Sequence, residues 1–276
     1  MTKHTQPWTG YLRLALANKH GRTIADDVYY QGAFKLSRPI RVDEAGQPGF
    51  YMMNPGGGYV DGDRYGIEVA LGEQAAALLT TQSSTKIYRT VNRPVVQDTR
   101  IVLKRGSVLE YIPDPLIAYK HARYEQRTVV HMEQGAAFIS AEIITPGWSP
   151  DGRPFRYDTL RLKTEVFQEG ELIVYDHLKL EPDTRHGTEY LEGHTHYGSM
   201  LVIGEAATPS FLDTLYTAIE ADSFPGKVGL SMLAVPGFTV RVLAMSTQQI
   251  ERLFEQCHRY IRHHWFGKGP LSLRKY

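Results

Sequence analysis

From Tyr11 to about residue 205, the chain consists of short segments in which apolar and polar residues alternate, separated by clusters of turn-forming residues. A period of two places the apolar side chains of a strand on one face, which is typical of antiparallel sheets with one buried face. The pattern therefore predicts a β-rich region over about residues 10–205. The alternation is clearest over 100–104, 124–131, 160–167 and 172–180.

Three stretches of this region resemble one another. They begin at Leu71, Leu103 and Met132, and each follows a predicted strand, forms a turn and leads into another strand. Their spacing of about 30 residues lies within the range of repeat architectures, so we expect stacked layers with two strands per layer. Residues 72–79 are alanine-rich and favour a helix by propensity, but the β-branched residues that follow at 80–81 favour a strand.

A first helix is predicted over about residues 208–222. Thr208 is a suitable N-cap, and Pro209 occupies the first helical position, where its missing N–H has no cost. The apolar residues of this segment recur at helical spacing and form one stripe. The stripe consists of Phe211, Leu212, Leu215, Tyr216 and Ile219.

A second helix is predicted over about residues 246–266, and strands are predicted between the two helices, over 227–244. Ser246 and Gln249 form a capping box, and Gly267 provides a left-handed stop. The apolar stripe of this helix consists of Ile250, Leu253, Phe254, Cys257, Ile261 and Trp265.

The chain is long enough to bury one large core, since 42% of its 276 residues are apolar. We therefore predict a single domain over residues 1–276, mainly β, with stacked antiparallel or mixed layers in a β-helix or sandwich-like arrangement. The two helices belong to its C-terminal part. The tail at 270–276 is expected to be loose.

The charges are nearly balanced, with 31 basic and 30 acidic side chains. This balance favours neither nucleic acid nor an anionic membrane as a partner. Cys257 is the only cysteine, which excludes an internal disulfide and a multi-thiolate zinc site and suits a reducing compartment, so we predict a cytoplasmic protein. No run approaches the roughly 20 apolar residues that cross a bilayer, and the N-terminus lacks the features of a signal peptide.

A glycine-rich segment stands out at 54–58, and Asp61-Gly62-Asp63 follows it. Consecutive glycines allow conformations with positive φ and close packing, so two tight turns flanking a short strand at 59–60 would explain the segment without any ligand. A P-loop would require Gly-Lys-Ser or Gly-Lys-Thr, and the chain contains neither. The protein is therefore not expected to hydrolyse nucleotides.

The order and spacing of four motifs, at 54–58, 61–63, 80–82 and 86–89, closely resemble the signature of the UreD family of urease accessory proteins, also called UreH. The resemblance continues through 106–117, through Gln126 and Thr128, and covers roughly residues 10–262. One departure lies at 142–148, where Trp148 replaces an arginine that many members have. Residues 152–155 take the place of the Gly-Glu-x-Phe sequence that follows in those members.

This resemblance implies a scaffold that is not an enzyme. The partners that the resemblance implies are the urease apoprotein, UreF-like and UreG-like accessory proteins and, less directly, a UreE-like nickel chaperone. GTP would then be bound by a partner GTPase. No tightly bound cofactor is expected, and nickel would pass only transiently through a polar passage on its way into the urease active site.

Five carboxylates lie within or beside the family-like motifs and are the candidate stations for nickel. Scattered single carboxylates suit an ion that must move on, because a dense cage of thiolates or imidazoles would trap it. A buried carboxylate without a partner is costly, so ion pairs with Lys86 or Arg89 would be the purely structural explanation. The candidates are Asp61, Asp63, Glu110, Asp114 and Glu142.

A cupin-like β-barrel metalloenzyme is the alternative interpretation. His194 and His196 are two residues apart on a predicted strand, as in the His-x-His motif of cupins. A cupin would require a glutamate about four residues later, whereas position 200 is Met200 and the next glutamate is Glu205. Convergence of the two histidines with a third ligand would favour this alternative.

Overall fold

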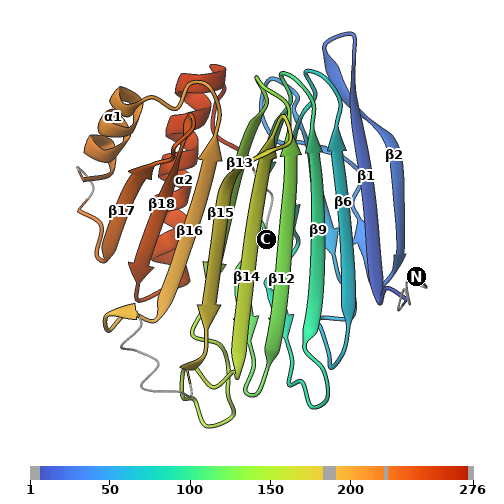
Figure 1. Cartoon of the computed structure of the whole chain (residues 1–276), viewed down its shortest axis with the longest axis vertical. Helices are drawn as coiled ribbons and strands as arrows, with labels where there is room; N and C mark the ends of the chain where they lie inside the picture. Colours follow the sequence, from blue (N-terminus) through green and yellow to red (C-terminus); the bar gives the residue numbers. More distant parts are fainter. Residues whose placement is uncertain (1–6, 183–190, 221–222, 273–276) are drawn as a thin grey trace.

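The computed structural model describes residues 7–182, 191–220 and 223–272. Two β-sheets lie face to face, and the strands of the first sheet form the front layer in Figure 1. In spatial order, this sheet contains β15 (Glu171–Leu180), β14 (Thr159–Gln168), β12 (Arg123–Met132), β9 (Val95–Leu103), β6 (Arg64–Leu71), β1 (Gly10–Lys19) and β2 (Arg22–Gly32).

The second sheet lies behind the first and is extended at one side by antiparallel strands. Its main path runs through β17 (Lys227–Met232), β18 (Gly237–Ala244), β16 (His196–Ile203), β13 (Ala137–Ile144), β10 (Val108–Tyr111), β7 (Ala76–Thr81), β5 (Pro48–Met53) and β3 (Lys35–Leu36). The short strands β4 (Ile40–Arg41), β8 (Thr85–Ile87) and β11 (Leu116–Ala118) pair beside this path.

The chain passes repeatedly from the first sheet to the second and back, so each turn of this coil contributes strands to both layers. The connections β6 to β7, β9 to β10 and β12 to β13 contain the three similar stretches found in the sequence. Each turn of the coil corresponds to one predicted stacked layer, and the stacking is confirmed, although two turns contain a third short strand, β8 and β11, beyond the predicted two. Residues 76–81, for which helix and strand propensities conflict, form strand β7.

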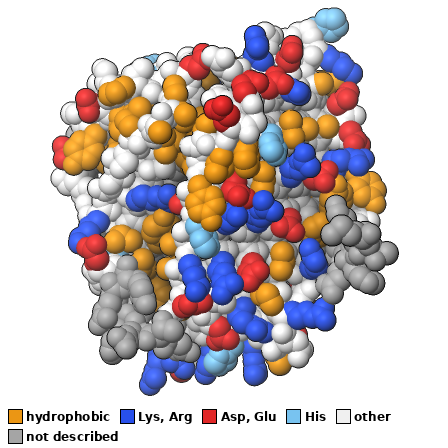
Figure 2. All heavy atoms as spheres, in the orientation of Figure 1, with side chains coloured by type: hydrophobic (Ala, Val, Ile, Leu, Met, Phe, Trp, Pro, Cys, Tyr) orange, Lys and Arg blue, Asp and Glu red, His pale blue; other side chains and the backbone are white. Residues whose placement is uncertain are grey.

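Pairing within the coil is parallel. Strands β1, β6, β9, β12 and β14 are parallel neighbours, and only β2 and β15 run antiparallel at the two ends of the first sheet. Of the two predicted arrangements, antiparallel or mixed, the mixed one is therefore confirmed, and the antiparallel pairing suggested by alternation does not hold for the central strands. Alternation reports only that one face is buried, and the outer face of this sheet carries interspersed basic and acidic side chains (Figure 2).

Two apolar cores result from this arrangement. The first lies between the sheets, where Leu12, Leu14 and Leu16 of β1 are almost fully buried. The second lies between the opposite face of the second sheet and helices α1 (Pro209–Glu220) and α2 (Thr247–Phe266). Among the described residues, neither helix is long and apolar enough to cross a membrane.

Both helices begin as predicted. Thr208 Oγ1 accepts a hydrogen bond from Phe211 N in α1, and Ser246 Oγ accepts one from Gln249 N in α2. Gly267 follows α2 in the left-handed conformation, with φ of 61°. The predicted apolar stripe of α1 is wrong at Tyr216, whose side chain is 41% exposed.

The second core encloses Cys257, and burial raises the pKa of its thiol to about 12. Gly198 of β16 allows α2 to approach closely, since a Cβ at this position would lie 2.5 Å from Ile250 Cγ2 and 2.9 Å from Phe254 Cζ. After α2, Ser272 N donates to Val42 O at 2.7 Å, which attaches the first part of the predicted tail to the β-structure. Residues 273–276 lie outside the described part of the chain.

Candidate functional site

A cavity of about 70 Å³ lies between the sheets, near the end where the parallel strands of the first sheet begin. One water needs about 10–15 Å³ of such space, so the cavity has room for several. The exposed residues Gly57 and Ser83 belong to its lining, which shows that it opens to the surface beside the glycine-rich turn. Its polar lining includes Asn54, Tyr59, Thr81, Gln97, Asp114, Tyr124, Gln126 and Glu142.

Glu142 of β13 is the most deeply placed carboxylate of this cavity. Its Oε1 accepts a hydrogen bond from Gln126 Nε2 on β12, which connects the two sheets. Burial raises the pKa of Glu142 to about 7, despite the opposing effects of the Gln126 hydrogen bond and the positive charge of Arg241. Although protein surrounds the group, part of Glu142 remains accessible because the cavity reaches it.

A tyrosine–glutamine ladder forms the wall of the cavity opposite β13. Gln97 and Gln126 are direct neighbours in the parallel register of β9 and β12. Tyr59 Oη donates to Gln97 Oε1 and Tyr124 Oη donates to Gln126 Oε1, both at 3.0 Å. Because these hydroxyls occupy the amide oxygens, the amide nitrogen of Gln126 is directed to the carboxylate of Glu142.

Asp114 also lines the cavity, at the end of the second sheet. Its backbone N–H donates to Thr81 Oγ1 at 2.8 Å, and the Thr81 hydroxyl donates to Asp114 Oδ2 at 3.1 Å. The structure therefore brings two of the five candidate carboxylates, Asp114 and Glu142, to one cavity.

Asp61 and Asp63 hold the turns of the glycine-rich motif. Asp61 Oδ1 accepts hydrogen bonds from the three consecutive backbone N–H groups of residues 91–93, at 2.9 to 3.0 Å. These hydrogen bonds lower the pKa of Asp61, and the bond from Arg93 has the largest effect. Asp63 Oδ2 accepts from Val60 N at 2.8 Å and from Tyr65 Oη at 3.0 Å. Both carboxylates thus fix the backbone next to the cavity mouth.

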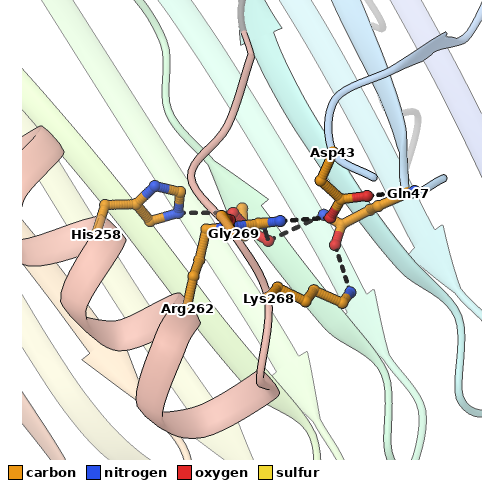
Figure 3. Close-up of polar contacts among 7 residues, drawn as sticks. Asp43, Gln47, His258, Arg262, Lys268 and Gly269 are labelled. Carbon is orange, nitrogen blue, oxygen red and sulfur yellow. Dashed lines mark hydrogen bonds and ion pairs between the residues drawn. The ribbon is translucent and has the colours of Figure 1, made fainter. Parts of the chain in front are cut away.

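Glu110 lies on the opposite face of the second sheet, beneath α2. Leu109 and Tyr111 of the same strand belong to the core between the sheets, so Glu110 faces away from the cavity. Arg262 and His258 of α2 contact its carboxylate, and His258 Nε2 lies 2.6 Å from Oε2. The remaining members of this buried polar cluster are Asp43, Gln47, Lys268 and the carbonyl of Gly269 (Figure 3).

The structural alternative, in which Lys86 or Arg89 would pair with these carboxylates, is wrong, since neither basic side chain forms an ion pair with any described residue. Backbone N–H groups, hydroxyls and amides solvate most of the carboxylates instead. Arg262 and His258, which stabilise Glu110, come from a helix far along the chain.

Gln97, the tyrosines of the ladder, Arg262 and His258 are functional or structural residues that were not predicted from the sequence. The sequence nevertheless contains a pattern that could have indicated the ladder. In both alternating strands, at 95–99 and 124–128, a glutamine and then a threonine occupy inward-facing positions. Polar residues at matched core positions of consecutive repeats indicate a polar interior.

His194 and His196 do not define a metal centre. His196 opens β16, whereas His194 precedes the strand and its Nδ1 lies 3.1 Å from Leu191 O. Nδ1 of His196 lies 2.8 Å from Thr195 Oγ1. Within 7–182, 191–220 and 223–272, no group of three or more His, Cys, Asp or Glu side chains is placed to hold a metal ion.

Comparison with known proteins identifies the relatives of this chain. The sequence profile described as UreD urease accessory protein matches residues 9–275. A protein of Lachnoclostridium phytofermentans named urease accessory protein UreD is 48% identical over 271 residues, covering 98% of this chain and 99% of that protein. Proteins of the same name from a Bacillus species (strain TB-90) and Actinomyces naeslundii are 44% and 42% identical, each covering 97% of this chain and 99% of the relative.

These relatives place the chain, with its coil of strands and polar cavity, among proteins that serve the maturation of an enzyme. The profile match and the near full-length identity show the family directly. The chain belongs to the UreD family of urease accessory proteins, and its role lies in urease maturation.

Proposed function

We propose that this protein is a non-catalytic scaffold whose cavity carries nickel as cargo to the urease apoprotein. The observation that supports the proposal most strongly is Glu142, an ionisable carboxylate deep in a cavity of about 70 Å³ that opens to the surface. Carboxylates and water are suitable ligands for a divalent cation in transit, and membership in a urease accessory family supplies the biological context.

A passage must hold its ion weakly at successive positions. Every 1.4 kcal/mol of additional affinity slows release about tenfold, so one deep site would stop transport. Asp114 and Glu142 supply single carboxylates to the same cavity, and the amide of Gln126 supports the inner one. We assign Asp114 and Glu142 as the stations, while Asp61, Asp63 and Glu110 stabilise the surrounding structure.

The pKa of about 7 suits Glu142 for temporary binding. At neutral pH the buried carboxyl exchanges readily between its neutral and ionised forms, so an arriving cation displaces a proton and a returning proton releases the cation.

A polar connection continues beyond Glu142. Ser199 of β16 lies next to Glu142 in the sheet register, and Arg241 of β18 donates to its hydroxyl. Arg241 also forms an ion pair with Asp176 of β15, whose side chain is 37% exposed. This row of polar groups links Glu142 to a partly exposed ion pair.

The proposed partners are the urease apoprotein and the UreF-like and UreG-like accessory proteins, with a UreE-like nickel chaperone acting indirectly. GTP would be hydrolysed by the UreG-like partner. The proposed location is the cytoplasm, which the single cysteine suits.

The test replaces Glu142 by glutamine, which keeps the shape of the side chain and its contact with Gln126 but removes the charge. The variant is co-produced with urease and the other accessory proteins, and both complex assembly by pull-down and nickel per urease active site are measured. We expect normal assembly with strongly reduced nickel content. Glu125→Gln on the outer face of β12 is the matched control. Full nickel loading by the Glu142 variant would refute the passage.

A further inference from the structure

Three aromatic rings form a row on the surface at the mouth end of the coil. The centroids of Tyr88 and Tyr119 are 4.8 Å apart, and those of Tyr119 and Trp148 are 5.0 Å apart. Parallel pairing of β8 with β11 and the bridge between Tyr119 and Trp148 bring residues from three successive segments into this row. Trp148 is 51% exposed, so the row ends in a large apolar surface open to solvent.

The rings line a shallow hollow together with basic side chains. Arg89 and Lys120 belong to its lining, which includes no acidic residue. Neither Arg89 nor Lys120 forms an ion pair with any described residue, so both are available to a partner. Exposed tryptophan, tyrosine and arginine side chains are enriched where proteins bind one another, and unpaired basic groups at the edge select an acidic partner.

The hollow, hereafter the aromatic–basic hollow, adjoins the cavity mouth. Tyr88 Oη donates to Gly57 O at 3.4 Å, and Gly57 lines the cavity. Gly58 lies so close that a Cβ there would be 2.6 Å from Tyr88 Cε2. A protein seated on the rings therefore lies directly beside the opening through which an ion would pass.

We propose that the aromatic–basic hollow docks an acidic segment of the partner protein that exchanges the ion with the cavity. Carboxylates of that segment pair with Arg89 and Lys120, and an apolar or proline side chain covers Trp148. This inference rests on the proposed function, because the hollow acquires its role from the neighbouring mouth.

The experiment uses the full chain carrying Arg89→Glu and Lys120→Glu together, and separately Trp148→Ala. Binding to purified urease apoprotein, and to each other purified urease accessory protein of the same organism, is measured by biolayer interferometry at two salt concentrations. We expect both variants to lose at least about tenfold in affinity for one of these proteins, and the charge-reversed variant to lose most of the salt dependence.

The matched control carries Arg22→Glu and Arg105→Glu, which reverse two exposed charges at the opposite end of the coil. This control should bind like the wild type. Wild-type affinity of both hollow variants for every partner would overturn the proposal. Self-association of the wild type that the charge reversal abolishes would also overturn it, because the occupant would then be a second copy of the chain.

Binding and nickel loading, measured on the same set of variants, distinguish a failure of the docking surface from a failure of the proposed passage. Loss of binding by the hollow variants, combined with full nickel loading by Glu142→Gln, would support the docking surface and refute the passage. Normal binding by the hollow variants, with nickel loading lost in Glu142→Gln, would refute the docking surface and leave the passage supported.

Discussion

Glu110 of β10 and Arg262 of α2 are 152 residues apart in the sequence and form an ion pair in which both side chains have 0% exposure. Arg262 also pairs with Asp43, so one guanidinium joins the early loop and the second sheet to the last helix. Burial alone would raise the pKa of Glu110, but the hydrogen bond and charge of His258 and the charge of Arg262 hold it at about 2.

Replacing Arg262 by methionine should destabilise the protein strongly. The change leaves the buried carboxylates of Glu110 and Asp43 without their shared cation, which typically costs about 3–5 kcal/mol. Urea unfolding followed by circular dichroism measures the loss. Arg127→Met removes an exposed arginine of the first sheet and should cost less than about 1 kcal/mol. Equal losses for the two variants would contradict a special role for the buried pair.

The low pKa of Glu110 predicts a loss of stability in acid. Because its folded pKa of about 2 lies below the ordinary value of 4.5, its contribution is complete above pH 4.5 and disappears as the pH falls towards 2. The free energy of unfolding of the wild type should therefore fall more steeply across this interval than that of Glu110→Gln. Parallel curves for the two proteins would show that the pair does not govern acid stability.

Glu142 should give the free energy of unfolding the opposite dependence on pH. Its folded pKa of about 7 lies above the ordinary value of 4.5, so ionisation destabilises the fold progressively as the pH rises from about 4.5 through about 7. The difference between these two pKa values corresponds to a loss of up to about 3 kcal/mol in the free energy of unfolding. Compared with the wild type, Glu142→Gln should gain melting temperature at pH 8 but not at pH 4.5. A gain of the same size at both pH values would argue against this titration.

Gly198→Ala should disturb the contact between β16 and α2. The added methyl would lie 2.5 Å from Ile250 Cγ2, and overpacking of this kind costs about 1–3 kcal/mol. Gly229→Ala in β17 is the control, since a Cβ there meets nothing within 4 Å. Its effect on the free energy of unfolding should stay within about 0.5 kcal/mol. Similar unfolding curves for the two variants would contradict close packing at Gly198.

Much of the fold was predictable from local chemistry. The cap residues Thr208, Ser246 and Gly267 defined both helices because capping depends on neighbours in the sequence. Strand direction was not predictable from alternation, since a period of two records burial and not the orientation of the adjacent strand. Tyr216 occupied a position on the predicted α1 stripe, but only the packed structure shows that its side chain is largely exposed.

The candidate site was predictable only in part. Motif resemblance led to Asp114 and Glu142, and the inward pattern around Gln126 contained a signal for the polar cavity wall. Glu110 belongs to the same motifs, but the alternation of its own strand directs it to the other sheet face. Arg262 borders the apolar stripe of α2, where a charged residue is usually solvated, and its long-range pairing with Glu110 has no signature in the local sequence.

The burial of Cys257 has a practical consequence. As the only cysteine of the chain, with a thiol that stays protonated inside the second core, it provides a chemically silent background for site-directed labelling. A single cysteine introduced at exposed Ser83 would react alone with a maleimide dye or spin label. Fluorescence or electron paramagnetic resonance could then follow events at the cavity mouth in the otherwise native protein.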